Sequence, residues 1–137
     1  MKNPKQNNQE KNWHLFDAKE KVLGRLAGQI AKILTGKDKV DYLPYMDKGD
    51  FVVVINAKEV RVTGKKEIQK KYYRHSGFPG GLRSKTVQDT REQNPQQLIR
   101  HAVIGMMPRN KLAHQMLKKL YVFPGNEHPY QDKIKQN

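Results

Sequence analysis

Residues 51–55 form a continuous apolar run, FVVVI, in which β-branched side chains dominate and no polar residue alternates with them. A strand of this composition is typically covered on both faces, as in a parallel sheet with helices above and below it. The shorter run WHLFD at 13–17 predicts a first strand, and an amphipathic helix lies between the two runs. Strand, helix and buried strand in this order predict an α/β domain.

The predicted helix between the strands has one apolar and one polar face. Its apolar side chains recur at helical spacing and are Leu23, Leu26, Ala27, Ile30, Ile33 and Leu34. The opposite face carries Arg25, Gln29 and Lys32. Gly36 stands where such a helix ends. We interpret Gly24 and Gly28 as small residues that allow close packing of this helix against its neighbours.

The second half of the chain contains further predicted elements. Asn94 and Pro95 predict a helix start, with Asn as the N-cap and Pro at the first helical position, and Pro108 closes this helix. A last helix is expected over 112–120, with a closing strand at 121–123. The predicted organisation is a flexible polar tail at 1–12, one domain at 13–124 and a polar tail at 125–137.

The chain has 137 residues, enough for one compact domain, and carries a formal net charge of +14. This excess of cations is most simply explained by a partner with many negative charges, either a nucleic acid or an anionic membrane surface. No apolar run approaches the roughly 18 residues of a membrane-spanning helix, and the polar first twelve residues do not resemble a signal peptide. We therefore expect a cytoplasmic protein that does not enter a membrane.

The densest group of cations lies in 65–85 and comprises Lys65, Lys66, Lys70, Lys71, Arg74, Arg83 and Lys85, against the single acid Glu67. Tyr72 and Tyr73 stand among these cations, and the following glycines and Pro79 predict a loop in the second half of the segment. Arginine pairs with phosphate, glycine lets the backbone approach it, and tyrosine stacks on an unpaired base. The pattern favours polyanion binding over the alternative, a solvated charged face.

Nucleotide, metal and nucleophile motifs are missing from the sequence. Thr63-Gly64-Lys65 resembles the end of a P-loop, but Glu59 and Lys66 occupy positions where that motif requires Gly and Ser or Thr. The five histidines lack metal-ligand spacing, and the chain has no cysteine. We expect no cofactor, no metal and no small-molecule substrate. His75, among cationic and flexible neighbours, is interpreted as a phosphate or base contact.

A second basic group stands where one predicted helix ends and the next begins, at 105–111. Here Met106 and Met107 are interpreted as core residues of a helix–helix corner. The cations expected to reach outward from this corner and the helix after it are Arg109, Lys111, Lys118 and Lys119.

Several segments together resemble the bacterial-type large-subunit ribosomal protein thirteen family. The most specific are YYRHSGFPGGL at 72–82 and GMMPRNK at 105–111, with VTGK at 62–65 between the buried strand and the basic loop. The resemblance runs from about Trp13 to Tyr130. It implies a three-layer α/β/α fold around a small, mainly parallel sheet with basic extensions. It further implies incorporation into the large ribosomal subunit and an early role in subunit assembly, with 23S-type rRNA and neighbouring ribosomal proteins as partners.

The resemblance and the basic clusters together define the expected RNA-binding residues. They are Arg25, Lys37, Lys39, Lys65, Lys66, Lys70, Lys71, Tyr72, Arg74, His75, Ser76, Gly77, Arg83, Lys85, Arg109, Asn110, Lys111, Lys118 and Lys119. The chain departs from the family pattern at Ile104, where a basic residue is usual, and at Ala113 and His114, where Gly and Arg are usual. Organellar ribosomes fit the resemblance as well as bacterial ones.

Two other functions are compatible with parts of the sequence. The α/β order also suits an enzyme with a phosphorylated or nucleotide substrate, although the broken P-loop disfavours it. The cations also suit an anionic membrane surface, but the predicted helices need their apolar faces for the core. The favoured function is a non-enzymatic ribosomal protein that neutralises phosphates and recognises the shape of folded RNA.

Overall fold

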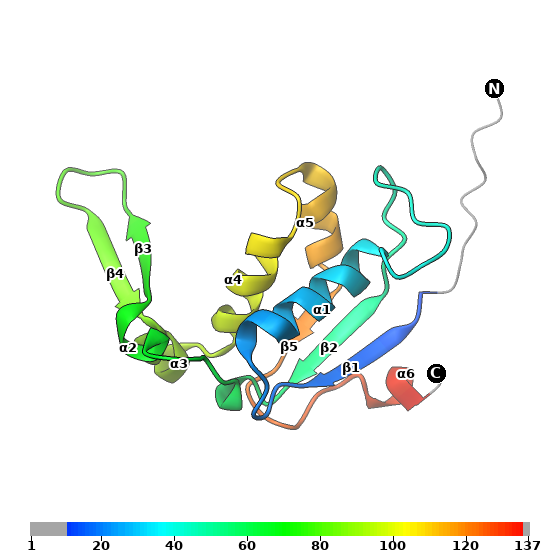
Figure 1. The fold of residues 1–137 in the computed structure, drawn as a ribbon, viewed down its shortest axis with the longest axis horizontal. Coiled ribbons are helices and arrows are strands. Elements are labelled where there is room, and N and C mark those ends of the chain that lie inside the picture. The colour runs from blue at the N-terminus through cyan, green and yellow to red at the C-terminus, as the bar shows by residue number, and fades with distance from the viewer. Residues whose placement is uncertain (1–10, 136–137) are drawn as a thin grey trace.

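A computed structural model describes residues 11–135 and contains a three-stranded, wholly parallel sheet (Figure 1). The strands are β1 (Trp13–Asp17), β2 (Phe51–Ile55) and β5 (Leu120–Val122), in the order β1-β2-β5. Trp13 lies opposite Phe51 in the register of the first pair. The apolar run at 51–55 is thus the central strand, and the predicted α/β fold with a mainly parallel sheet is confirmed.

Three helices cover one face of the sheet: α1 (Leu23–Thr35), α4 (Gln96–Met106) and α5 (Lys111–Leu117) (Figure 1). Val52 and Val54 point toward these helices and belong to the main core. The core stripe of α1 follows the predicted spacing, apart from Ile33, which is only partly buried. The apolar face of α1 is therefore used in the core, and its polar face stays exposed.

The opposite face of the sheet is covered by aromatic side chains and the C-terminal segment. Val53 is fully buried on this face. Beside it the Trp13 ring stacks on Phe51, with centroids 4.4 Å apart, and on Tyr130, at 5.1 Å. The last helix, α6 (Gln131–Lys135), contacts β1 on the same side. Strand β2 is therefore enclosed on both faces, as its composition predicted.

Residues 57–93 form a group of short elements whose base packs on α4, and a hairpin projects from this base away from the sheet (Figure 1). The segment consists of a 3₁₀ turn η1 (Ala57–Glu59), helix α2 (Lys66–Gln69), strands β3 (Lys71–His75) and β4 (Leu82–Thr86), and helix α3 (Val87–Gln93). We call residues 66–93 the arm. The expectation of a loop in the second half of 65–85 holds for the glycine-rich turn but was wrong for Leu82–Thr86, which pairs antiparallel with β3.

The start of α4 differs from its prediction at Asn94. The helix begins at Gln96, and the Asn94 side chain makes no cap: its Oδ1 is buried and has no hydrogen-bond partner. The first helical N–H groups instead bond to the backbone carbonyls of Asn94 and Pro95. Side-chain capping occurs elsewhere, at Thr86 for α3 and at Asn110 for α5.

The expected flexible tail at 1–12 falls mostly outside the described residues, which begin at Lys11. The described part of that tail is tied to the sheet, since the Asn12 N–H donates to Asp50 and its carbonyl accepts from Phe51. Within 11–135, none of the helices combines the length and the apolar composition needed to cross a membrane.

Candidate nucleic-acid interface

The hairpin of the arm has one strongly cationic face. Its antiparallel register places Tyr72 opposite Lys85 and Arg74 opposite Arg83, and alternation along the strands puts these four side chains on the same face. Like charges placed directly opposite each other destabilise a strand pair. Arg74 and Arg83 are both exposed, so their repulsion would be relieved by an anion bound between them.

Arg91 fastens the arm to the body of the protein. Its Nε and Nη2 donate to the two carboxylate oxygens of Glu67 at 2.8 and 3.1 Å, a bidentate pair between α3 and α2. Its Nη1 donates to the carbonyls of Lys58 and Val60 at 2.8 and 2.5 Å. One guanidinium therefore joins both helices at the base of the hairpin to the chain that leaves the sheet.

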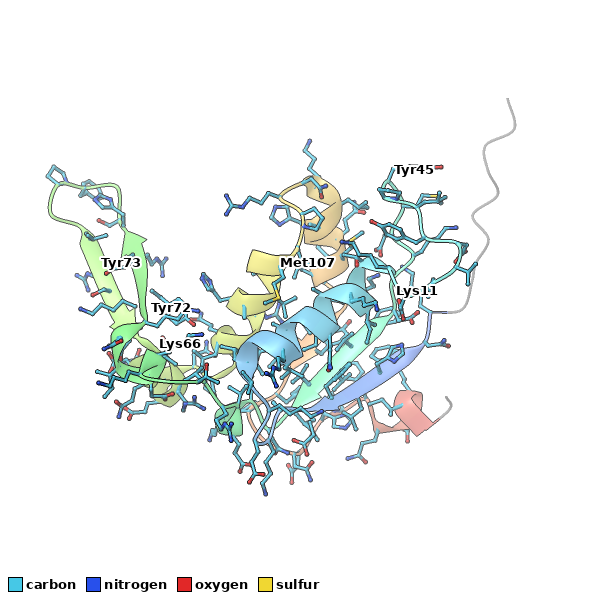
Figure 2. The ribbon with its side chains drawn as sticks, in the orientation of Figure 1. Lys11, Tyr45, Lys66, Tyr72, Tyr73 and Met107 are labelled. Atoms are coloured by element: carbon cyan, nitrogen blue, oxygen red, sulfur yellow. The ribbon has the colours of Figure 1, made fainter. Side chains whose placement is uncertain are left out.

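A hollow of about 550 Å³ lies between the cationic face of the hairpin and α4. From the hairpin it is lined by Tyr72, Tyr73, Arg74, Arg83 and Lys85. From the helices it is lined by Thr90, Gln97, Arg100, His101 and Ile104. In Figure 2 Tyr72 extends from the hairpin toward α4, whereas Tyr73 lies farther along the strand.

Two more hollows continue along α1 and α4. The second, of about 560 Å³, is lined by Arg25, Lys66 and Lys70 and shares His101 with the first. The third, of about 430 Å³, is lined by Lys32 and Lys37 and shares Met106 with the second. Because neighbouring hollows share lining residues, we treat all three as one surface, the furrow.

Glycines in α1 contribute to the furrow by leaving space. A Cβ at Gly24 would meet no atom within 4 Å, and one at Gly28 would only reach the Met106 sulfur at 3.9 Å. Gly24 lines the second hollow and Gly28 the third. The interpretation of these residues as close-packing positions was therefore wrong, since both border open space.

The charged side chains that line the furrow are all of one sign. The lining contains nine lysine and arginine side chains, and none of its described residues is acidic. The nine cations are Arg25, Lys32, Lys37, Lys66, Lys70, Arg74, Arg83, Lys85 and Arg100. A concave surface lined by one sign of charge concentrates its field and attracts counter-ions of the opposite sign.

Sequence reasoning missed Arg100, His101 and Lys32 as furrow residues. Gln97, Arg100, His101 and Ile104 recur at helical spacing on the exposed side of α4, opposite its buried stripe. The polar face of this helix was the available signal. It was missed because Arg100 is the single Lys or Arg of α4 and lies outside the basic groups at 65–85 and 105–111.

Tyr72 both packs against the core and lines the furrow. Its ring packs against the core and meets His101 edge-on, with centroids 4.8 Å apart. Lys70 Nζ lies 5.6 Å from the centre of the same ring. Burial raises the pKa of the Tyr72 hydroxyl. Tyr73, by contrast, is exposed.

Lys119 is the clearest correction to the predicted site. Its side chain is buried, forms an ion pair with Asp47 and donates to the Gly49 carbonyl at 2.8 Å. Burial lowers the pKa of Lys119, and the hydrogen bond from Lys119 to Asp47 opposes that shift. Lys119 therefore fastens the 36–50 connection to the sheet and cannot face an external ligand.

Lys39 and Asn110 also serve the fold. Lys39 Nζ lies 2.8 Å from Oδ1 of the buried Asp50. Asn110 accepts a hydrogen bond from the Ala113 N–H at 2.9 Å and so caps α5. These two side chains bind other groups of the protein, so they are not free to contact RNA as the sequence predicted.

The other predicted residues are exposed but do not line the furrow. They form three groups: Lys65 and Lys71 on the arm, His75, Ser76 and Gly77 at the hairpin turn, and Arg109, Lys111 and Lys118 on and beside α5. The α4–α5 corner adjoins the furrow, because Pro108 lines the third hollow. The departure at Ile104 leaves an apolar side chain in the first hollow.

The parallel sheet, the basic arm and the furrow together define a small basic α/β protein with a surface suited to a polyanion. The model of the ribosomal protein L13 family matches residues 11–129. The large ribosomal subunit protein uL13 of Aquifex aeolicus is 57% identical over 122 residues, covering 89% of this chain and 85% of the relative.

Two further relatives with the same name agree with this match. The protein of Geobacter sulfurreducens is 54% identical over 121 residues, covering 88% of this chain and 85% of its own length. That of Pelobacter propionicus is 52% identical over 123 residues, covering 90% and 87%. The chain therefore belongs to the ribosomal protein L13 family, and it is a structural protein and not an enzyme.

Proposed function

We propose that this protein is a component of the large ribosomal subunit that binds folded 23S-type rRNA in the furrow and supports early assembly of the subunit. The observation that carries the proposal is the lining of the furrow, with nine cations and no acid among its described residues. The names of the relatives support the assignment to the large subunit.

Binding in the furrow would use charge and shape together. Each phosphate neutralised by Lys or Arg releases condensed counterions, which gives affinity without base recognition. The arm and α4 form two walls, and Arg91 fixes the base of the arm. Because the walls are held before binding, little conformational freedom would be lost when RNA enters.

The remaining assignments belong to the same proposal. We place the protein in the cytoplasmic ribosome of a bacterium, with the ribosome of an organelle as the alternative. Its partners would be the rRNA and neighbouring large-subunit proteins. The exposed cations outside the furrow, such as Arg109, Lys111 and Lys118, would contact RNA strands that pass over α5.

The proposal is tested by incorporation into subunits. Arg74→Ala and the pair Lys70→Ala, Lys71→Ala should each lower the amount of protein that sediments with large-subunit particles, because they remove cations from the furrow and its rim. Tagged variants would be followed through a sucrose gradient of a Geobacter sulfurreducens lysate, and circular dichroism would verify folding.

The matched control is the pair Lys19→Ala, Lys58→Ala. Both lysines are exposed, and neither lines the furrow. The control removes as much charge as the lysine pair of the arm and should leave incorporation unchanged. Equal losses in both pairs would show that only net charge matters, and normal incorporation of the arm variants would refute the proposed interface.

A further inference from the structure

Phe78, at the tip of the hairpin, is a large apolar side chain that nothing in the described chain covers. It is 74% exposed. The turn that carries it lies at the end of the hairpin farthest from the sheet (Figure 1). Two further exposed apolar side chains, Tyr73 and Leu82, stand on the same hairpin. A group of exposed apolar side chains marks an interaction site, whereas a single one does not.

The turn that carries Phe78 is tightly constructed. The Ser76 N–H donates to the Gly81 carbonyl, and the Gly81 N–H donates to the Phe78 carbonyl. A Cβ at Gly81 would lie 2.0 Å from Ser76 Oγ and 2.9 Å from the Phe78 carbonyl oxygen, so only glycine fits there. Gly77 and Gly80 adopt positive φ angles, which glycine allows without strain. The local backbone therefore presents Phe78 in a defined direction.

The surroundings of Phe78 identify the kind of partner. Between Glu67 and Asp89 the chain contains no carboxylate, and Arg74, Arg83 and Lys85 follow the two strands toward the turn. A partner at this tip must tolerate a high density of positive charge and also offer an apolar surface. An unpaired nucleotide meets both requirements, because its phosphate is anionic and its base has a flat π-face.

We propose that Phe78 is a stacking platform for an unpaired base of the large-subunit rRNA, with the arginines of the hairpin contacting the adjoining phosphates. This inference rests on the proposed function and adds a contact outside the furrow. Phosphate contacts alone position a protein on RNA, whereas a stacked base requires a nucleotide that is free of its helix. The hairpin tip would therefore select a site where the rRNA is locally single-stranded.

The first test compares Phe78→Tyr, Phe78→Leu and Phe78→Ala in filter binding to in vitro transcribed large-subunit rRNA of Geobacter sulfurreducens. Loss of one stacked base is expected to weaken binding roughly 5- to 100-fold. Tyrosine keeps the ring and should bind like the native chain. Leucine keeps an apolar side chain but has no π-face, so it should lose affinity nearly as far as alanine.

Two results with the Phe78 variants would overturn the inference. Native-like affinity of Phe78→Leu would show that the ring is not needed for stacking. Native-like affinity of Phe78→Ala for bare rRNA, combined with poor incorporation into particles, would identify a protein as the partner of the tip. All three side chains suit an exposed position, and thermal unfolding would verify that the variants are folded.

The second test places a fluorescent reporter at the tip. Phe78→Trp adds a second tryptophan to a chain whose only other one, Trp13, is packed in the aromatic layer under the sheet. The same rRNA should quench the emission of the added tryptophan, with the native chain as the blank. Unchanged emission while the rRNA is bound would overturn the stacking contact.

Failure of this inference can be told apart from failure of the proposed function. If Arg74→Ala and Arg83→Ala weaken rRNA binding while every Phe78 variant binds normally, rRNA binding in the furrow is supported and the stacking contact is refuted. If neither set of variants weakens binding, the proposed function itself fails.

Discussion

At the residue scale, two neighbouring lysines show how far a cation's role depends on its surroundings. Lys118 is exposed at the end of α5, whereas Lys119 is buried and paired with Asp47, 72 residues away in the sequence. Adjacent identical residues cannot be distinguished by type, and periodicity alone did not separate them. The predicted site therefore included both, and only Lys118 remains a candidate for RNA.

The pair formed by Lys119 and Asp47 gives a first prediction. Asp47→Asn leaves the buried ammonium group without its counter-charge, and we expect the free energy of unfolding to fall by about 3 kcal/mol. Urea denaturation would measure it. Adding Lys119→Met to Asp47→Asn should recover most of the loss, because no unpaired charge remains. If Asp47→Asn alone is neutral, Lys119 does not depend on its partner.

Asp50 gives a prediction that depends on pH. Burial raises its pKa, but hydrogen bonds from Lys39, His14 and the Asn12 N–H outweigh burial, so the pKa lies below its ordinary value of 3.8. The charged carboxylate therefore stabilises the fold above the unfolded-state pKa, and this contribution disappears as pH falls through the lower folded-state pKa.

Asp50→Asn should accordingly lower the free energy of unfolding at pH 7 by about 2 kcal/mol. The difference in the free energy of unfolding between Asp50→Asn and the native chain should become smaller below about pH 4. Urea denaturation at pH 7 and pH 3 would compare the two, with Asp38→Asn, an exposed acid on the same connection, as the control. If this difference in the free energy of unfolding is the same at both pH values, Asp50 acts through packing and not through its charge.

At the scale of elements, the hairpin differs from the rest of the structure in how it is stabilised. A two-stranded hairpin is at best marginally stable alone. Three of its large apolar side chains, Tyr73, Phe78 and Leu82, are exposed. Its stability comes from its base, where α2 and α3 pack and Arg91 makes four hydrogen bonds.

Arg91→Lys should therefore loosen the arm selectively. Lysine cannot reproduce the bidentate pair with Glu67 together with the two carbonyl contacts. We expect a loss on the order of 2 kcal/mol, concentrated in faster amide hydrogen exchange of β3 and β4. Arg61→Lys, at an exposed arginine, is the control. Equal acceleration in the sheet and the hairpin would contradict a local role for Arg91.

At the scale of the whole molecule, the charges are segregated. Cations line the furrow, whereas several acids of the described chain are engaged elsewhere: Asp47 and Asp50 pair with lysines beside the sheet, and Glu67 is held by Arg91. Because these acids are paired elsewhere, none of them offsets the nine cations that line the furrow.

This segregation predicts the salt dependence of RNA binding. If Arg74 and Arg83 each neutralise a phosphate, the double variant Arg74→Ala, Arg83→Ala should reduce the slope of log K against log salt by roughly 1.5. Filter binding to large-subunit rRNA over a range of salt concentrations would measure the slope. Lys19→Ala, Lys58→Ala should leave the slope unchanged, and an identical change in both variants would contradict a localised interface.

Much of the fold was accessible from the sequence because it follows from local patterns. The β-branched run at 51–55 identified the central strand, and helical spacing identified α1. The hairpin was only half predicted, since Leu82–Thr86 is polar and its strand structure depends on pairing with β3. The expected cap at Asn94 failed because neighbouring backbone carbonyls satisfy the first N–H groups of α4.

The sequence by itself determined that this protein has an α/β core and a large excess of positive charge, because both properties depend only on residue types and their spacing. Only the tertiary structure decided which cations are free to bind a polyanion. Folding brings distant segments together, so it places Arg100 in the furrow and buries Lys119 beside Asp47. A charge buried beside an opposite charge is no longer available to a partner.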